Sequence, residues 1–176
     1  MITYRLADSL ARDAVRDAPA CEKIEGERRK RLEALLDAGL GSCLLRRPEV
    51  ARLVIDNWLY FEAVRYQLAA WVVMPNHVHV LVEVIAGYPL SEIVHGWKSF
   101  TAKAIARIIG VRGRVWWPDY WDRAVRNEKH FKRAVEYIVE NPVSAGLVDR
   151  AEDWPWSTAG TAGGPPAVPG PPNSYK

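Results

Sequence analysis

The chain has 176 residues, of which 49% are hydrophobic and 26% charged, so its length and composition predict a single domain around one hydrophobic core. Two cysteines without a Cys-x-x-Cys pair argue against a disulfide framework or a cysteine-built zinc site. The net charge is +3, and no segment approaches the roughly 20 apolar residues that a membrane span requires, so we expect a soluble, cytoplasmic protein.

The first half of the chain contains a predicted strand, two helical stretches and a β-hairpin. Residues 2–6 form the strand, a charged and helix-prone stretch covers 11–40, and apolar side chains continue at helical spacing through 48–66. The β-branched and aromatic residues of 66–73 and 77–84 predict two strands. The Met-Pro-Asn sequence between these strands has the composition of a turn, which indicates a hairpin.

The second half contains two predicted helices separated by an irregular or extended stretch at 112–126. The first helix is expected from Ser91, a candidate N-cap, to just before Gly110, which closes it. Asn127 can cap the last helix, which is expected over about 128–140.

The order of these elements predicts an α+β domain with a mainly antiparallel sheet and helices packed on it. Nine of the last 17 residues are Gly or Pro, which is typical of a disordered segment. We therefore assign residues 1–158 to one folded domain and residues 159–176 to a disordered tail.

Two histidines stand one residue apart in the most hydrophobic part of the chain. Side chains alternate along a strand, so His77 and His79 share one face, and Val78 begins a row of valines on the core-facing side. The histidines are about 6.6 Å apart along the strand, which lets both rings lean toward one metal ion. The pattern alone is weak, because two surface histidines on a strand need no metal.

The last helix offers a nucleophile and a third ligand. Tyr137 and Asn141 lie one turn apart on the same face of this helix, with only the small Ala134 below them. In the alternative, structural interpretation, Tyr137 is a half-buried aromatic side chain and Asn141 is the helix C-cap before Pro142.

The positive charge is concentrated in one segment. Residues 95–133 carry 10 Lys or Arg against 3 Asp or Glu, which is the footprint of a polyanion-binding surface. The candidates for contacts with DNA phosphates are the basic residues in or just after the helix that starts at Ser91: Lys98, Lys103, Arg107, Arg112 and Arg114. The alternative is that these side chains are simply solvated on the surface of the helix. Tryptophans of this segment can stack on unpaired bases, but at least two of the four are expected in the core: Trp97, Trp116, Trp117 and Trp121.

In combination, these stretches resemble the HUH single-tyrosine transposases, close to the REP-associated tyrosine transposases and their insertion-sequence relatives. The matching stretches span residues 4–157 and read YRLADSL, WVVMPNHVHVLVE, LSEIVHGWKSFTAKAI, DRAVRNEKHF, YIVENPVSAGLV and DWPWS. The resemblance places the family's histidine pair on His77 and His79, its nucleophile on Tyr137 and its third metal ligand on Asn141.

The resemblance implies a ferredoxin-like fold in which the histidines face the tyrosine helix. It also implies a transposase that cleaves single-stranded DNA at hairpin-flanked sites through a covalent 5′-phosphotyrosine, with Mg²⁺ or Mn²⁺ as cofactor. Members of the family can dimerise, so a homodimer is one expected state. Two alternatives stay open: a DNA- or RNA-binding module that keeps the fold without cleaving, and an unrelated hydrolase that uses a metal-bound water.

Overall fold

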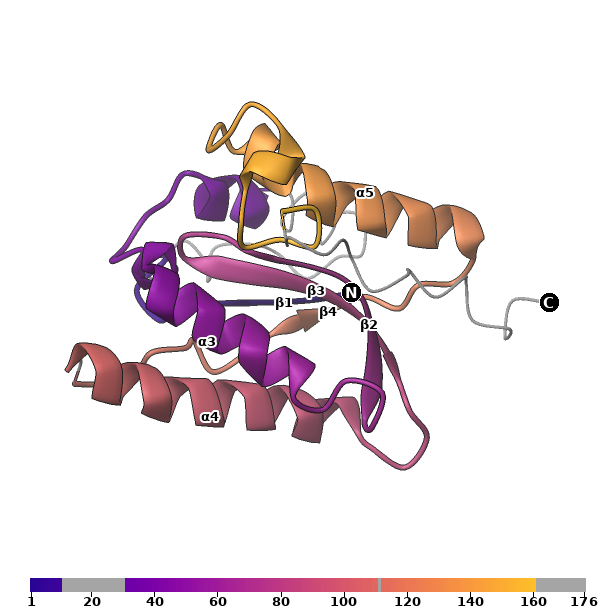
Figure 1. Cartoon of the computed structure of the whole chain (residues 1–176), viewed down its shortest axis with the longest axis horizontal. Coiled ribbons are helices and arrows are strands. Elements are labelled where there is room, and N and C mark those ends of the chain that lie inside the picture. The colour runs from indigo at the N-terminus through magenta and orange to yellow at the C-terminus, as the bar shows by residue number, and fades with distance from the viewer. Residues whose placement is uncertain (11–30, 111, 161–176) are drawn as a thin grey trace.

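A computed structural model describes residues 1–10, 31–110 and 112–160, and within them four strands form one antiparallel sheet between two layers of helices (Figure 1). The strand order is β2-β3-β1-β4. The strands are β1 (Ile2–Arg5), β2 (Tyr66–Val73), β3 (His77–Val84) and β4 (Trp121–Asp122). The predicted hairpin is confirmed, because β2 and β3 pair antiparallel and begin and end where the sequence indicated.

Helices cover both faces of this sheet. Helices α3 (Pro48–Leu59) and α4 (Leu90–Ile109) lie on one face, and α5 (Glu128–Ser144) crosses the other (Figure 1). Residues 31–37 are helical and lie on the α5 side, where Asp37 approaches β3. Short 3-10 helices occur at η1 (Leu44–Arg46) and η2 (Ala151–Asp153).

Helices α3 and α4 each differ from the sequence prediction at one end. Helix α3 was expected to continue to residue 66 but ends at Leu59, because the chain turns back to begin β2. Ala63 adopts a positive φ of 60° in this turn, and its N–H donates to the carbonyl oxygen of Tyr66. Helix α4 begins at Leu90 with Pro89 as its N-cap, so Ser91 lies inside the helix and does not cap it.

A glycine closes the C-terminal end of α4, and an asparagine caps the N-terminal end of α5. Gly110 has a φ of 67° at the end of α4, as predicted. Helix α5 is capped by Asn127, whose side chain accepts from the backbone N–H of His130. It continues past residue 140 to Ser144, because a proline near a helix end removes only one late hydrogen bond. Asn141 therefore lies in the last turn of α5.

The rest of the sequence-based organisation is tested only in part. The helical residues 31–37 fall inside the stretch expected at 11–40, and residues 11–30 lie outside the described ranges. The tail predicted at 159–176 lies beyond the described residues from 161 onward. None of the helices in the described ranges combines the length and apolar character needed to cross a bilayer.

The core on the α3 and α4 side is built around buried aromatic residues joined by hydrogen bonds. The indole N–H of Trp58 donates to the hydroxyl of Tyr4 at 3.0 Å, and the Tyr66 hydroxyl donates to the Trp58 carbonyl at 2.7 Å. The indole N–H of Trp97 donates in turn to the Tyr66 hydroxyl at 2.9 Å. Val78 packs into this core, so the expected core-facing row of β3 is confirmed at this position.

The core under α5 uses smaller side chains. Ala70 of β2 and Leu81 of β3 pack against Ala134 and Ile138 of α5. Small residues on both surfaces let the helix lie close to the sheet, which brings the C-terminal half of α5 next to the face of β3 that carries the histidines.

Candidate active site

His77 and His79 form the centre of the candidate site. Both side chains are fully buried, and they point away from the core that contains Val78. Their Nε2 atoms are 3.1 Å apart, so the two rings converge on one point as the sequence suggested.

The ring of His77 is oriented by the residue before it. Its Nδ1 lies 2.8 Å from Oδ1 of Asn76, and because an amide oxygen only accepts, Nδ1 of His77 must be the donor. The Asn76 amide is itself fixed, since its Nδ2 donates to the carbonyl oxygen of Leu40 at 2.9 Å. A neutral imidazole that carries its proton on Nδ1 has a lone pair on Nε2, so His77 presents an acceptor atom to the site.

The ring of His79 has a partner that suits either tautomer. Its Nδ1 lies 2.8 Å from the hydroxyl oxygen of Thr3, which is the residue opposite His79 in the pairing of β1 with β3. In one tautomer Thr3 donates to Nδ1, and Nε2–H of His79 donates to His77. In the other tautomer Nδ1–H donates to Thr3, and the Nε2 lone pairs of both histidines face the same point.

Both histidines are held in their neutral form. Burial, and then the neighbouring His79, lowers the pKa of His77 well below its usual value. Burial alone lowers the pKa of His79 to about 3. Metal binding requires neutral imidazoles, so at neutral pH a cation would not have to displace a proton from either ring.

Helix α5 brings Tyr137 and Asn141 to this pair. The Tyr137 ring stands edge-on to the His79 ring, with the ring centroids 5.2 Å apart. Asn141 is only 3% exposed, and its Oδ1 accepts no hydrogen bond from any residue that the structure describes. A buried carbonyl oxygen without a hydrogen-bond donor lowers the stability of a fold by roughly 1–3 kcal/mol. This amide is therefore better suited to serve as a metal ligand than to fill space in the core.

The donor set fits a divalent cation held by neutral ligands. Over residues 1–10, 31–110 and 112–160, no three His, Cys, Asp or Glu side chains gather where one metal ion could bind them. A cation centred on His77 and His79 therefore needs a third ligand of another type. The buried amide oxygen of Asn141, which follows Tyr137 by one helical turn, is such a ligand.

Asp37 is a neighbour of the site that sequence reasoning missed. Its Oδ1 lies 3.6 Å from Nε2 of His77 and is buried, and it finds no hydrogen-bond partner within the described ranges. Burial, and then the negative charge of Glu33, raises the pKa of Asp37 to about 6. Because His77 is neutral, this contact is not an ion pair. The sequence contains a signal for Asp37, because a negative charge in the last turn of a helix is repelled by the negative end of the helix dipole.

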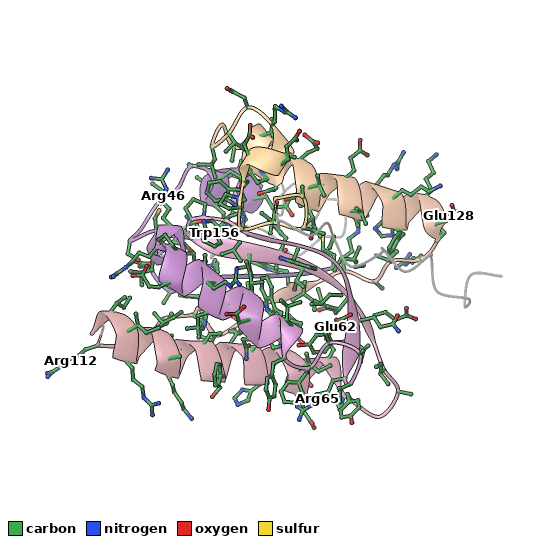
Figure 2. All side chains as sticks on the ribbon, in the orientation of Figure 1. Arg46, Glu62, Arg65, Arg112, Glu128 and Trp156 are labelled. Carbon is green, nitrogen blue, oxygen red and sulfur yellow. The ribbon has the colours of Figure 1, made fainter. Side chains whose placement is uncertain are left out.

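The predicted DNA-contacting residues lie elsewhere. Lys98, Lys103 and Arg107 belong to α4, which covers the face of the sheet opposite to the histidines (Figure 1). Figure 2 shows Arg112 pointing outward beyond the C-terminal end of α4, and Arg114 follows it in the chain. The ammonium group of Lys98 donates to the backbone carbonyls of Pro118 and Asp119, so this lysine supports the loop before β4. The role of these residues in DNA binding stays a prediction, but they do not adjoin Tyr137.

Two of the tryptophans are core residues, as expected. Trp97 is 2% exposed and Trp116 is 4% exposed, and the indole N–H of Trp116 donates to the hydroxyl of Thr101. Trp117 is half-buried and stacks under the guanidinium group of Arg5, whose central carbon lies 4.2 Å from the ring centroid.

Comparison with known proteins finds relatives that resemble the part of the chain carrying these residues. The model of the family "Transposase IS200 like" matches residues 57–141, a range that contains both histidines, Tyr137 and Asn141. A REP-associated tyrosine transposase of Escherichia coli (strain K12) is 33% identical over 93 residues, which are 53% of this chain and 54% of that protein. The resemblance to these transposases is confirmed.

Other relatives extend the comparison. A putative REP-associated tyrosine transposase of Haemophilus influenzae is 34% identical over 44 residues, a quarter of each chain. The matched part of this chain thus spans about half the length of the E. coli relative and less of the second. The structure of a REP-associated tyrosine transposase bound to a REP hairpin has a TM-score of 0.52 and 24% identity, and the match covers 89% of this chain and 73% of that one. The predicted α+β fold is confirmed by this likeness.

Proposed function

We propose that the chain is a transposase that cuts and rejoins single-stranded DNA at hairpin-flanked sites, with Tyr137 as the nucleophile. The observation that carries the proposal is the meeting of the Tyr137 ring with His79, at 5.2 Å between ring centroids. The resemblance to the REP-associated transposases and the likeness to one bound to a REP hairpin support the same chemistry and substrate.

His77, His79 and Asn141 would hold the divalent cation, Mg²⁺ or Mn²⁺. All three ligands are neutral, so a bound cation keeps its full double charge; when bound, it supplies Lewis-acid stabilisation of a phosphate oxygen on which charge develops. The residues around the ligands orient them: Asn76 fixes the ring of His77, and Thr3 supports the ring of His79.

The covalent step exchanges one phosphate ester for another. The hydroxyl oxygen of Tyr137 attacks the scissile phosphorus, the bond from phosphorus to the 3′ oxygen breaks, and the phenol proton is balanced by the proton that the leaving 3′ oxygen gains. The products are a 5′-phosphotyrosine and a free 3′-hydroxyl. The number of phosphodiester bonds is unchanged, so rejoining is the reverse reaction with a new 3′-hydroxyl and needs no external energy source.

The test uses hairpin oligonucleotides taken from the DNA that flanks the encoding gene. With Mn²⁺ or Mg²⁺, a 3′-labelled strand should become attached to the protein on a denaturing gel, and a 5′-labelled strand should yield a short fragment that a polymerase can extend. Tyr137→Phe should bind the oligonucleotide as the parent chain does and form no adduct. An adduct of undiminished yield in Tyr137→Phe would remove this residue from its proposed role.

The same assay separates the alternatives. Tight binding without a metal-stimulated product from any flanking hairpin would favour a DNA-binding module that has lost cleavage. Turnover that survives Tyr137→Phe would favour hydrolysis by a metal-bound water. We favour the transposase over that hydrolase because the Tyr137 ring lies beside His79, and hydrolysis by a metal-bound water has no use for a tyrosine there.

A further inference from the structure

A cavity of about 840 Å³ opens beside Tyr137. Its walls come from the segment after β4, from the first turns of α5, from Met1 and from Glu33. This volume lies in the range of sites that take drug-sized ligands, about 300–1,000 Å³, so it exceeds the need of a single phosphate group.

The wall of this cavity is positively charged. The described residues that line it include four cations, which are Arg123, Arg126, Lys129 and Arg133, and two carboxylates, those of Glu33 and Asp122. His130 also lines it and adds no charge at neutral pH: burial, and then the positive charges of Arg123, the amino terminus, Arg126 and Arg133, lowers the pKa of its imidazole. The cavity is therefore suited to an anion with more than one charge.

The cations lead toward the proposed nucleophile. Lys129, Arg133 and Tyr137 are four residues apart in succession, so they form a line along one face of α5. The rise of 1.5 Å per residue makes this line about 12 Å long. A strand advances about 3.4 Å per nucleotide in a duplex and further when extended, so the line covers two or three phosphates.

A neighbouring cavity favours an unpaired strand. It has a volume of about 290 Å³ and shares Met1 and the residues 122–124 with the cationic cavity. Much of its remaining wall is apolar, including Leu81, Val84 and Phe131. Unpaired bases expose apolar faces that a duplex keeps stacked inside. A row of cations beside this smaller apolar cavity therefore matches single-stranded DNA.

We infer that the cavity lined by Arg123, Arg126, Lys129 and Arg133 binds consecutive backbone phosphates of the single strand next to the phosphate that Tyr137 attacks. This inference rests on the proposed function and deepens it, because it assigns the path of the substrate to the α5 side of the sheet and not to α4. The smaller apolar cavity, lined by Leu81, Val84 and Phe131, takes a base of the same strand.

The experiment compares adjacent residues of α5 that have the same charge. Arg133 lines the cavity, whereas Lys132 is exposed and pairs with Glu128 at 2.7 Å. Arg133→Gln and Lys132→Gln each remove one positive charge from the same helix turn. Both are made in the Tyr137→Phe chain, so that the affinity for a short single-stranded DNA of mixed sequence is measured without cleavage.

Each phosphate contact on a single strand changes the slope of log K against log salt by about 0.7. Arg133→Gln should therefore lower this slope by about 0.7 and weaken binding about fivefold at 0.1 M salt, and adding Lys129→Gln should double the change in slope. Lys132→Gln should stay within about twofold of its parent, since Lys132 does not line the cavity. Lys103→Gln on α4 should weaken binding less than Arg133→Gln does. Thermal melting confirms that each variant is folded.

Three results would overturn the inference: equal losses in Arg133→Gln and Lys132→Gln, a larger loss in Lys103→Gln, or equal binding of blunt duplex DNA. All three concern affinity alone. Failure of the proposed function would instead appear as intact binding without a covalent adduct in the chain that retains Tyr137.

Discussion

Replacement of Thr3 by valine tests whether the residues behind the histidines prepare the site for a cation. Valine has nearly the shape of threonine but cannot accept the Nδ1 proton of His79, which the Thr3 hydroxyl meets at 2.8 Å. A bound cation requires the His79 tautomer with its proton on Nδ1, and in the variant this buried N–H has no acceptor. Loss of such an outer partner typically weakens metal binding 10- to 100-fold, which corresponds to about 1.4–2.7 kcal/mol.

The assay is calorimetric titration of the purified chain with Mn²⁺, accompanied by circular dichroism to verify the fold. Thr3→Ser keeps the hydroxyl and serves as the control, with an expected dissociation constant within about threefold of that of the parent. The reasoning is refuted if Thr3→Val binds Mn²⁺ as tightly as Thr3→Ser does, because the hydroxyl would then have no part in orienting His79.

Further predictions address the third ligand and the scaffold. Asn141→Leu should abolish measurable Mn²⁺ binding in the same titration. It should leave the free energy of unfolding within about 1 kcal/mol of the parent or raise it, because it removes a buried amide oxygen with no donor among the described residues. A large loss of stability would show that the amide has a structural role. Tyr66→Phe deprives the indole N–H of Trp97 of its acceptor and the carbonyl of Trp58 of its donor, so it should lower the free energy of unfolding in urea by about 2 kcal/mol. Asn127→Ala removes the cap of α5 and should cost about 1 kcal/mol in the same experiment, and an unchanged midpoint would count against the cap.

The parts of the site that could be predicted from the sequence are those set by local geometry. The alternation of a strand places His77 and His79 on one face, and the helical repeat places Tyr137 and Asn141 one turn apart, whatever the rest of the fold does. The proline-containing turn likewise fixes the hairpin ends. These features depend only on residues close together in the chain, so pattern alone was sufficient.

The remaining features depend on pairing between distant segments. Thr3 meets His79 only because β1 lies beside β3 in a particular register, across 76 residues of chain. The charge of residues 95–133 indicates a polyanion-binding surface, yet the candidates for DNA contact that the sequence offers lie in or just after α4. No local pattern states that α4 and α5 cover opposite faces of the sheet, so the cations near Tyr137, such as Arg133, were passed over.

The turn before β3 is bonded to separate parts of the chain. Its backbone carbonyls accept from the N–H groups of Leu6 and Leu45, and the side chain of Asn76 donates to Leu40. The end of the hairpin that carries His77 is thus locked when the domain folds, and the entropy of aligning that ring is lost at folding and not at metal capture. We expect cations to exchange without rearrangement of the backbone, with a speed governed by how readily water and DNA enter the site.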